Sequence, residues 1–193
     1  VKNIAIGGFA MGACAGNSSS RQHNIVMGCR AAGCLTTGSK NLVLGYLAGD
    51  KMLTGTSNVY LGDYSGGFAV GHANVFIGKY AGKGSSTASN NTGVCNVAIG
   101  RCALKSFTSG GNNIAIGNES MSAGTVTGSN NITVGYQAGN AITSGTGNIA
   151  IGQEAGKTNT GNNNSIAIGK QALSLGTGGN TIAIGHYAGQ NTA

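Results

Sequence analysis

Short aliphatic runs separated by glycine-rich polar segments recur along the whole chain. Each run places two large aliphatic side chains two residues apart, as at Ile114 and Ile116, and a small residue commonly lies between them. Alternate residues of a β-strand share a face, whereas residues on one face of a helix recur every three or four positions. The spacing therefore predicts a short strand in each run, opened by asparagine and closed by glycine as in 113–117.

The strand motif occurs eleven times, with steps of 16 to 22 residues between successive closing glycines. A typical repeat would be roughly 60 Å long if it were extended, so each repeat must fold back on itself. Such a period is typical of a solenoid, in which each repeat forms one coil. We therefore predict a single all-β domain over 1–193, a parallel β-solenoid (β-roll) of about eleven coils. The closing glycines are Gly7, Gly28, Gly45, Gly62, Gly78, Gly100, Gly117, Gly135, Gly152, Gly169 and Gly185.

Three further columns of residues recur at fixed distances from the strand. The closing glycine predicts a sharp turn, because glycine adopts positive φ without steric cost. Three positions later every repeat has alanine or serine, which predicts close approach of two backbones, either across a thin coil or between chains. Nine of the eleven repeats open with asparagine, so their amides are expected to stack in a ladder along the rod. The turn preference of asparagine is an alternative explanation for part of that column.

The aliphatic pairs are expected to form the core. We predict that Ile114, Ile116 and their equivalents form a continuous interior column. The residues between them would then point the opposite way, and their small apolar side chains would contact another layer or chain. This arrangement predicts a homotrimeric rod. The outward-facing positions would include Ala5, Ala98, Ala115, Ala150, Ala167 and Ala183.

The composition is that of an ordered repeat protein. The 193 residues include 37 glycines and no proline, and 8% are charged, while the regular aliphatic pairs argue against disorder. No apolar run reaches the roughly 18 residues that cross a bilayer, so no membrane span is expected. The chain begins inside a repeat. We therefore expect a fragment or processed piece of a longer fibre, with adjoining domains or stacked copies at both ends.

Basic residues are concentrated in the N-terminal half of the chain. Residues 1–105 contain nine Lys and Arg against two acidic residues, whereas 106–193 contain two of each. The preferred explanation of the asymmetry is solubility of an otherwise uncharged fibre, and the alternative is attraction to a surface glycan or lipopolysaccharide. The basic residues follow no recognition motif, so nucleic acid is not an expected partner.

The sequence contains no motif for catalysis or metal binding. The five cysteines match no zinc or redox spacing, although Cys14 and Cys34 occupy near-equivalent places one coil apart, where a disulfide is conceivable. Residues 152–158 imitate a phosphate-binding loop but have three residues between the glycines where the motif requires four. The four carboxylates form no sequence-near pair for acid–base catalysis. We therefore expect no enzyme activity, no catalytic residues, no metal and no cofactor.

Recognition by a regular rod is expected where the repeat varies. The two positions after each closing glycine hold five of the six tyrosines, together with charged residues. Aromatic rings pack on the apolar faces of sugars while polar groups bind their hydroxyls. The alternative explanation is that tyrosine is a favourable residue in strands and at their edges. The candidate glycan-contact residues are Tyr46, Tyr64, Lys79, Tyr80, Arg101, Tyr136 and Tyr187.

The repeat unit Gly-x-Asn-Asn-Ile-Ala-Ile-Gly-x-x-Ala-Gly/Leu is clearest at 111–121, 147–156 and 179–189. It resembles the head repeats of trimeric autotransporter adhesins and, more closely in its 17-residue length, repeats of phage tail fibres. The resemblance covers the whole chain. It implies a trimeric parallel β-roll that acts as a stiff spacer and host-binding surface, located on a virion or extracellularly on a cell surface.

The leading hypothesis is therefore a structural fibre or adhesin segment that contributes to attachment. One alternative is a self-stacking extracellular filament. An ice-binding solenoid is a second, but its threonines lie at different offsets from the closing glycines, so no flat array is expected. A tailspike-like glycan hydrolase is a third, and the shortage of carboxylates disfavours it.

Overall fold

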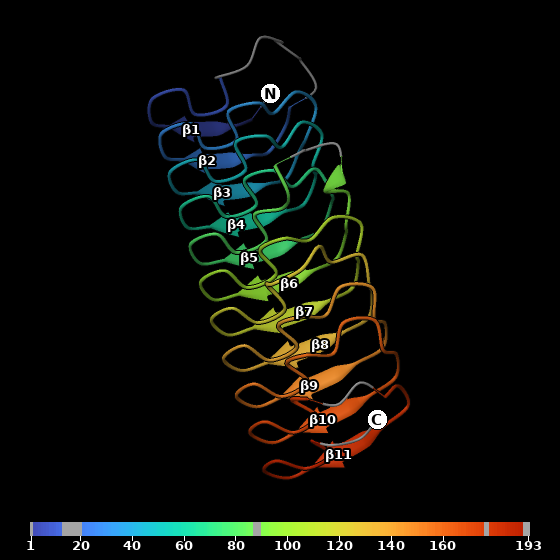
Figure 1. Cartoon of the computed structure of the whole chain (residues 1–193). Coiled ribbons are helices and arrows are strands. Elements are labelled where there is room, and N and C mark those ends of the chain that lie inside the picture. Colours follow the sequence, from blue (N-terminus) through green and yellow to red (C-terminus); the bar gives the residue numbers. More distant parts are fainter. Residues whose placement is uncertain (1, 13–20, 87–89, 176–177, 191–193) are drawn as a thin grey trace.

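The computed structural model describes residues 2–12, 21–86, 90–175 and 178–190, and over these residues the chain winds as a parallel β-solenoid (Figure 1). Eleven three-residue strands pair in chain order within one parallel sheet, and equivalent residues of successive strands are in register. The predicted all-β solenoid is confirmed. The strands are β1 (Ile4–Ile6), β2 (Ile25–Met27), β3 (Leu42–Leu44), β4 (Val59–Leu61), β5 (Val75–Ile77), β6 (Val97–Ile99), β7 (Ile114–Ile116), β8 (Ile132–Val134), β9 (Ile149–Ile151), β10 (Ile166–Ile168) and β11 (Ile182–Ile184).

Each strand turns its central residue, and not its aliphatic pair, towards the inside of the coil. In β7 Ala115 is fully buried, whereas Ile114 is half-buried and Ile116 is 37% exposed. The same alternation holds from β2 to β11. The prediction of an interior isoleucine column with outward-facing alanines is therefore wrong. The first and third residues of the strands instead form a continuous outward surface, which we call the aliphatic face.

The interior is narrow because the turn after each strand folds back against the strand. Ser120 Oγ donates a 2.7 Å hydrogen bond to Thr133 Oγ1 on the next strand, and Ser65 Oγ donates to the Phe76 carbonyl at 2.8 Å. Each coil buries one central strand residue, from Ala115 to the larger Tyr60, and leaves the flanking pair outside. The column of alanine and serine after the closing glycine is buried from Ala31 to Ala172, so of the two predicted alternatives it marks close approach across a thin coil.

Large and small side chains compensate one another inside the coils. Where the strand centre is Tyr60 or Phe76, the position four after the closing glycine is Gly66 or Gly82, and a Cβ at Gly82 would lie 2.3 Å from the Phe76 ring. In three coils whose strand centre is alanine that position is larger, with Leu104, Met121 and Leu173, whereas the coils of Ala150 and Ala183 keep glycine there. A further column, seven after the closing glycine, fills the remaining space with Leu35, Met52, Ala69, Phe107 and Ile142. Dense packing is thus reached with changing residues in each coil.

The closing glycines satisfy two constraints at once. Gly117 has a φ of +128°, and a Cβ on it would lie 2.5 Å from the carbonyl oxygen of Gly135 in the next coil. The predicted positive φ is confirmed, and close stacking of the coils adds a second reason for glycine. A second glycine column lies on the opposite turn, where a Cβ at Gly110 would approach the Gly128 carbonyl oxygen within 2.3 Å.

The predicted asparagine ladder is also confirmed. Asn131 is buried. Its backbone N–H and its Nδ2 both donate to Asn113 Oδ1 of the preceding coil at 3.0 Å. Its Nδ2 also donates to the Gly145 carbonyl of the following coil at 2.8 Å. Its Oδ1 accepts from the backbone N–H and Nδ2 of Asn148. Each amide therefore joins three coils and holds the turn that precedes the next strand. Ser165 ends the asparagine run, and its N–H donates to Asn148 Oδ1 at 3.0 Å.

Replacing Asn131 by alanine is expected to lower the free energy of unfolding by at least about 3 kcal/mol. The change removes the partner of the Gly145 carbonyl and of the Asn148 backbone N–H, and one of the two bonds of Asn148 Nδ2, which keeps its bond to the Asn162 carbonyl; each such loss in a buried region costs about 1–3 kcal/mol. Chemical denaturation followed by circular dichroism measures the loss. Asn131→Ser is the matched control, because serine occupies the equivalent place at position 165 and should cost less. Equal stability of the alanine variant and the unmodified chain would contradict the ladder's role.

Candidate functional site

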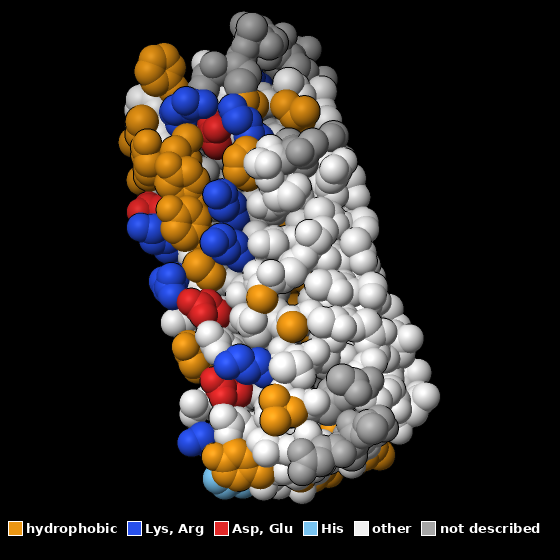
Figure 2. All heavy atoms as spheres, in the orientation of Figure 1, with side chains coloured by type: hydrophobic (Ala, Val, Ile, Leu, Met, Phe, Trp, Pro, Cys, Tyr) orange, Lys and Arg blue, Asp and Glu red, His pale blue; other side chains and the backbone are white. Residues whose placement is uncertain are grey.

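The turns that follow the strands carry the variable side chains. The second residue after each closing glycine has a left-handed backbone although none of these residues is glycine, with φ of +57° at Tyr64 and +63° at Tyr80. This conformation costs a non-glycine residue roughly 1–2 kcal/mol, which the stacked coil must supply. The tight turn directs this side chain and its neighbours along one edge of the rod. Figure 2 shows hydrophobic side chains beside Lys and Arg gathered along that edge, next to a broad uncharged face.

Three tyrosines from successive coils form a continuous row. The rings of Tyr46 and Tyr64 meet edge-on with centroids 5.6 Å apart, and those of Tyr64 and Tyr80 are tilted at 5.2 Å. Tyr46 is 49% exposed, and the other two are half-buried. Partial desolvation, followed by the neighbouring tyrosines, raises the pKa of the Tyr64 hydroxyl above its ordinary value. The row therefore offers neutral hydroxyls and ring faces to solvent.

Lysine side chains surround the Tyr80 end of this row. The Nζ atoms of Lys79 and Lys83 each lie 5.4 Å from the Tyr80 ring centroid, and that of Lys105 lies at 5.9 Å. Lys83 also lies 5.8 Å from the Tyr64 ring and 5.5 Å from the Phe68 ring. These are cation–π distances, within about 6 Å of the centroid. The three lysines around Tyr80 are called the lysine cluster below.

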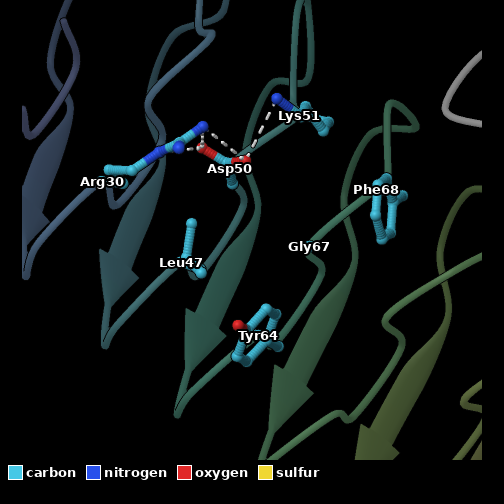
Figure 3. A pocket seen from close by; sticks show the side chains of 7 residues that line it. All are labelled: Arg30, Leu47, Asp50, Lys51, Tyr64, Gly67 and Phe68. Carbon is cyan, nitrogen blue, oxygen red and sulfur yellow. Dashed lines mark hydrogen bonds and ion pairs between the residues drawn. The ribbon is translucent and has the colours of Figure 1, made fainter. Parts of the chain in front are cut away.

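A pocket of about 250 Å³ opens beside the row (Figure 3). At its rim the largely buried Asp50 carboxylate accepts from the Arg30 guanidinium and pairs with Lys51 Nζ, all at 3.3 Å. Leu47, Tyr64 and Phe68 supply apolar lining on successive turns. The pocket thus combines apolar walls with an orientated ion triad, an arrangement suited to a small polar ligand group.

The structure brings together four of the seven candidate contact residues: Tyr46, Tyr64, Lys79 and Tyr80. Arg101 lies one coil further, but its guanidinium forms a 2.7 Å ion pair with Glu119. Tyr136 and Tyr187 are exposed on distant coils, where Tyr187 packs on His186 with centroids 3.9 Å apart. Sequence reasoning missed Lys83, Lys105 and Phe68. The signal for both lysines was available, since each lies five residues after a closing glycine.

The glutamates of the C-terminal half are held by neighbouring coils. Gln137 Nε2 donates to Glu119 Oε2 at 2.8 Å, and this bond, with Arg101, holds the pKa of Glu119 below its ordinary value. Glu154 likewise accepts from Gln171 at 2.6 Å and Lys157 at 3.0 Å, which lowers its pKa. Within the described residues no group of three or more His, Cys, Asp or Glu side chains could hold a metal ion. These two carboxylates therefore link successive coils through side-chain hydrogen bonds.

Two remaining predictions concern a disulfide and a membrane span. Cys34 is buried and disulfide-bonded, but Cys14 lies outside the described residues, so its pairing stays a prediction. In the described part of the chain, no helix is long and apolar enough to cross a bilayer.

Comparisons with protein-family models, with curated proteins and with solved structures give no match.

Proposed function

We propose that this chain is a structural fibre or adhesin segment, a stiff rod on a virion or cell surface that contributes to attachment. The observation that carries the proposal is the aliphatic face, which runs along all eleven strands. Its side chains remain substantially exposed in the single chain, with Ile99, Ile116 and Ile151 each 37% exposed. A contiguous apolar surface of this length usually marks an interaction site.

The proposed occupant of the aliphatic face is a second and third copy of the same chain. The face repeats once per coil with nothing but Ile, Leu, Val and Met along both of its columns. A partner that matches this repeat over the full length needs the same rise per coil, which an identical chain has. The resemblance to trimeric fibre repeats favours three copies around a common axis. The trimer thus rests on the outward isoleucines, and not on the alanines from which it was first predicted.

Light scattering at micromolar concentration is expected to give about three times the 18.9 kDa mass of one chain. The double variant Ile116→Asp and Ile151→Asp places charges on the aliphatic face and should reduce this mass. The matched control, Asn118→Asp and Gln153→Asp, adds the same charge at exposed turn positions of the same coils and should not. A monomeric mass for the unmodified chain, or an unchanged mass in the isoleucine variant, would refute the assembly.

A self-stacking filament is the second candidate, because β1 and β11 are edge strands of the parallel sheet and can pair with further strands. Electron microscopy separates the two. Rods of uniform length support the closed trimer, whereas continuous fibres support end-to-end stacking.

A further inference from the structure

The lysine cluster concentrates positive charge, which the Glu119 carboxylate offsets only in part, through Lys105. Lys79 and Lys83, from the same turn as Tyr80, and Lys105, from the next coil, converge on the Tyr80 ring. Four ion pairs occur among the described residues, Arg30 and Lys51 with Asp50, Arg101 with Glu119, and Lys157 with Glu154. None of them includes a cluster lysine. Like charges held close together raise the local potential and attract an anionic ligand.

The ring faces beside the cluster add a second preference. The cluster adjoins Tyr64 and Phe68 through Lys83, so the cations lie at one end of an aromatic row. A purely electrostatic site for any polyanion needs no such row. A pyranose ring offers both an apolar face that packs on tyrosine and, in an acidic sugar, an anionic group that pairs with lysine.

The pocket supplies polar groups at the other side of Tyr64. Its Arg30–Asp50–Lys51 triad presents both donors and a carboxylate acceptor, the combination that sugar hydroxyls require. Figure 3 shows Tyr64 and Phe68 on the same turn segment, joined through Gly67, with the ion triad on the other side of the pocket. The lysine cluster, the tyrosine rings and the polar groups of the pocket therefore lie in sequence along the edge of the rod.

We propose that the Tyr64–Tyr80 row with the lysine cluster binds an acidic saccharide. Its sugar rings pack on the tyrosines, its anionic group pairs with Lys83 and its neighbours, and an adjacent hydroxyl enters the pocket. The proposal deepens the attachment role proposed above by naming the ligand class. It is independent of trimer formation, because all of these residues lie on the turns and none on the aliphatic face.

An array of oligosaccharides of equal length tests the ligand class with the unmodified chain. The array carries matched neutral, carboxylate-bearing and sulfate- or phosphate-bearing members, and polyglutamate serves as a polyanion without sugar rings. Binding to one or more acidic members above both the neutral members and polyglutamate is the expected result, and the pattern identifies the anionic group. Equal binding of polyglutamate would overturn the proposal in favour of charge alone, as would equal binding of neutral sugars or no binding at all.

Two variants then locate the site. Lys79→Gln, Lys83→Gln and Lys105→Gln together are expected to weaken binding about ten- to hundredfold, since each exposed contact contributes about two- to fivefold. Tyr64→Leu with Tyr80→Leu keeps the charges and should also weaken binding. The matched control, Lys2→Gln, Lys40→Gln and Lys170→Gln, changes net charge equally and should bind normally. Equal losses in cluster and control variants would overturn the proposal. Light scattering on each variant keeps a failure of assembly distinct from a failure of binding.

Discussion

Replacing Ala115 by aspartate is expected to lower the free energy of unfolding by several kcal/mol, whereas the same change at the adjacent Ile116 should cost much less. Ala115 is fully buried inside its coil, where a carboxylate would have neither water nor a partner. Ile116 points outward and is 37% exposed in the single chain, so a charge there stays hydrated. Thermal unfolding followed by far-ultraviolet circular dichroism compares the two variants at matched chain concentration.

Dilution separates folding from assembly in this comparison. Self-association stabilises the folded state by mass action, so part of the loss in Ile116→Asp should come from weakened assembly. That part should vanish at chain concentrations where the unmodified protein is itself dissociated. The loss in Ala115→Asp should persist at every concentration. Equal losses for the two variants after dilution would contradict the inward alanine and the outward isoleucine.

Replacing Gly117 by alanine is expected to cost more than about 3 kcal/mol, because two penalties act at the same residue. Its φ of +128° is a conformation that alanine rarely adopts, and the new Cβ would lie 2.5 Å from the Gly135 carbonyl oxygen. Relief of the clash requires the two coils to separate, which breaks strand pairing and the asparagine ladder beside it. Chemical denaturation of the purified variant measures the cost.

Two other glycines dissect this effect. Gly185 has a φ of +126°, but a Cβ there meets nothing closer than the Ala188 Cβ at 3.9 Å. Gly185→Ala should therefore show backbone strain alone, about 1–3 kcal/mol. A Cβ on Gly8 meets nothing within 4 Å, so Gly8→Ala should be nearly neutral. If Gly117→Ala cost no more than Gly185→Ala, close stacking of the coils would not be what requires glycine.

Features that repeat at a fixed period could be predicted from the sequence. The strand positions, the positive φ after each strand, the thin coil and the asparagine ladder all follow from columns such as Gly117 and Asn131. The same local constraint acts once in every coil, so eleven copies reinforce one interpretation. Part of the candidate site followed for the same reason, since Tyr64 and Tyr80 occupy one column and therefore stack.

The direction of the strand faces was decided by the tertiary structure. The two-residue spacing shows that Ile114 and Ile116 share a face of the strand. The same spacing is compatible with that face pointing inward or outward. The choice depends on the width of the coil, which is set when the turn residues pack against the strand centre and leave room for Ala115 alone. The side chains that fill the interior, such as Phe107 and Ile142, occupy a repeating position but change in type from coil to coil, so the sequence pattern does not identify them as core. Likewise, Lys79 and Lys83 lie near Tyr80 in the chain, but Lys105 joins them only because the next coil stacks on theirs.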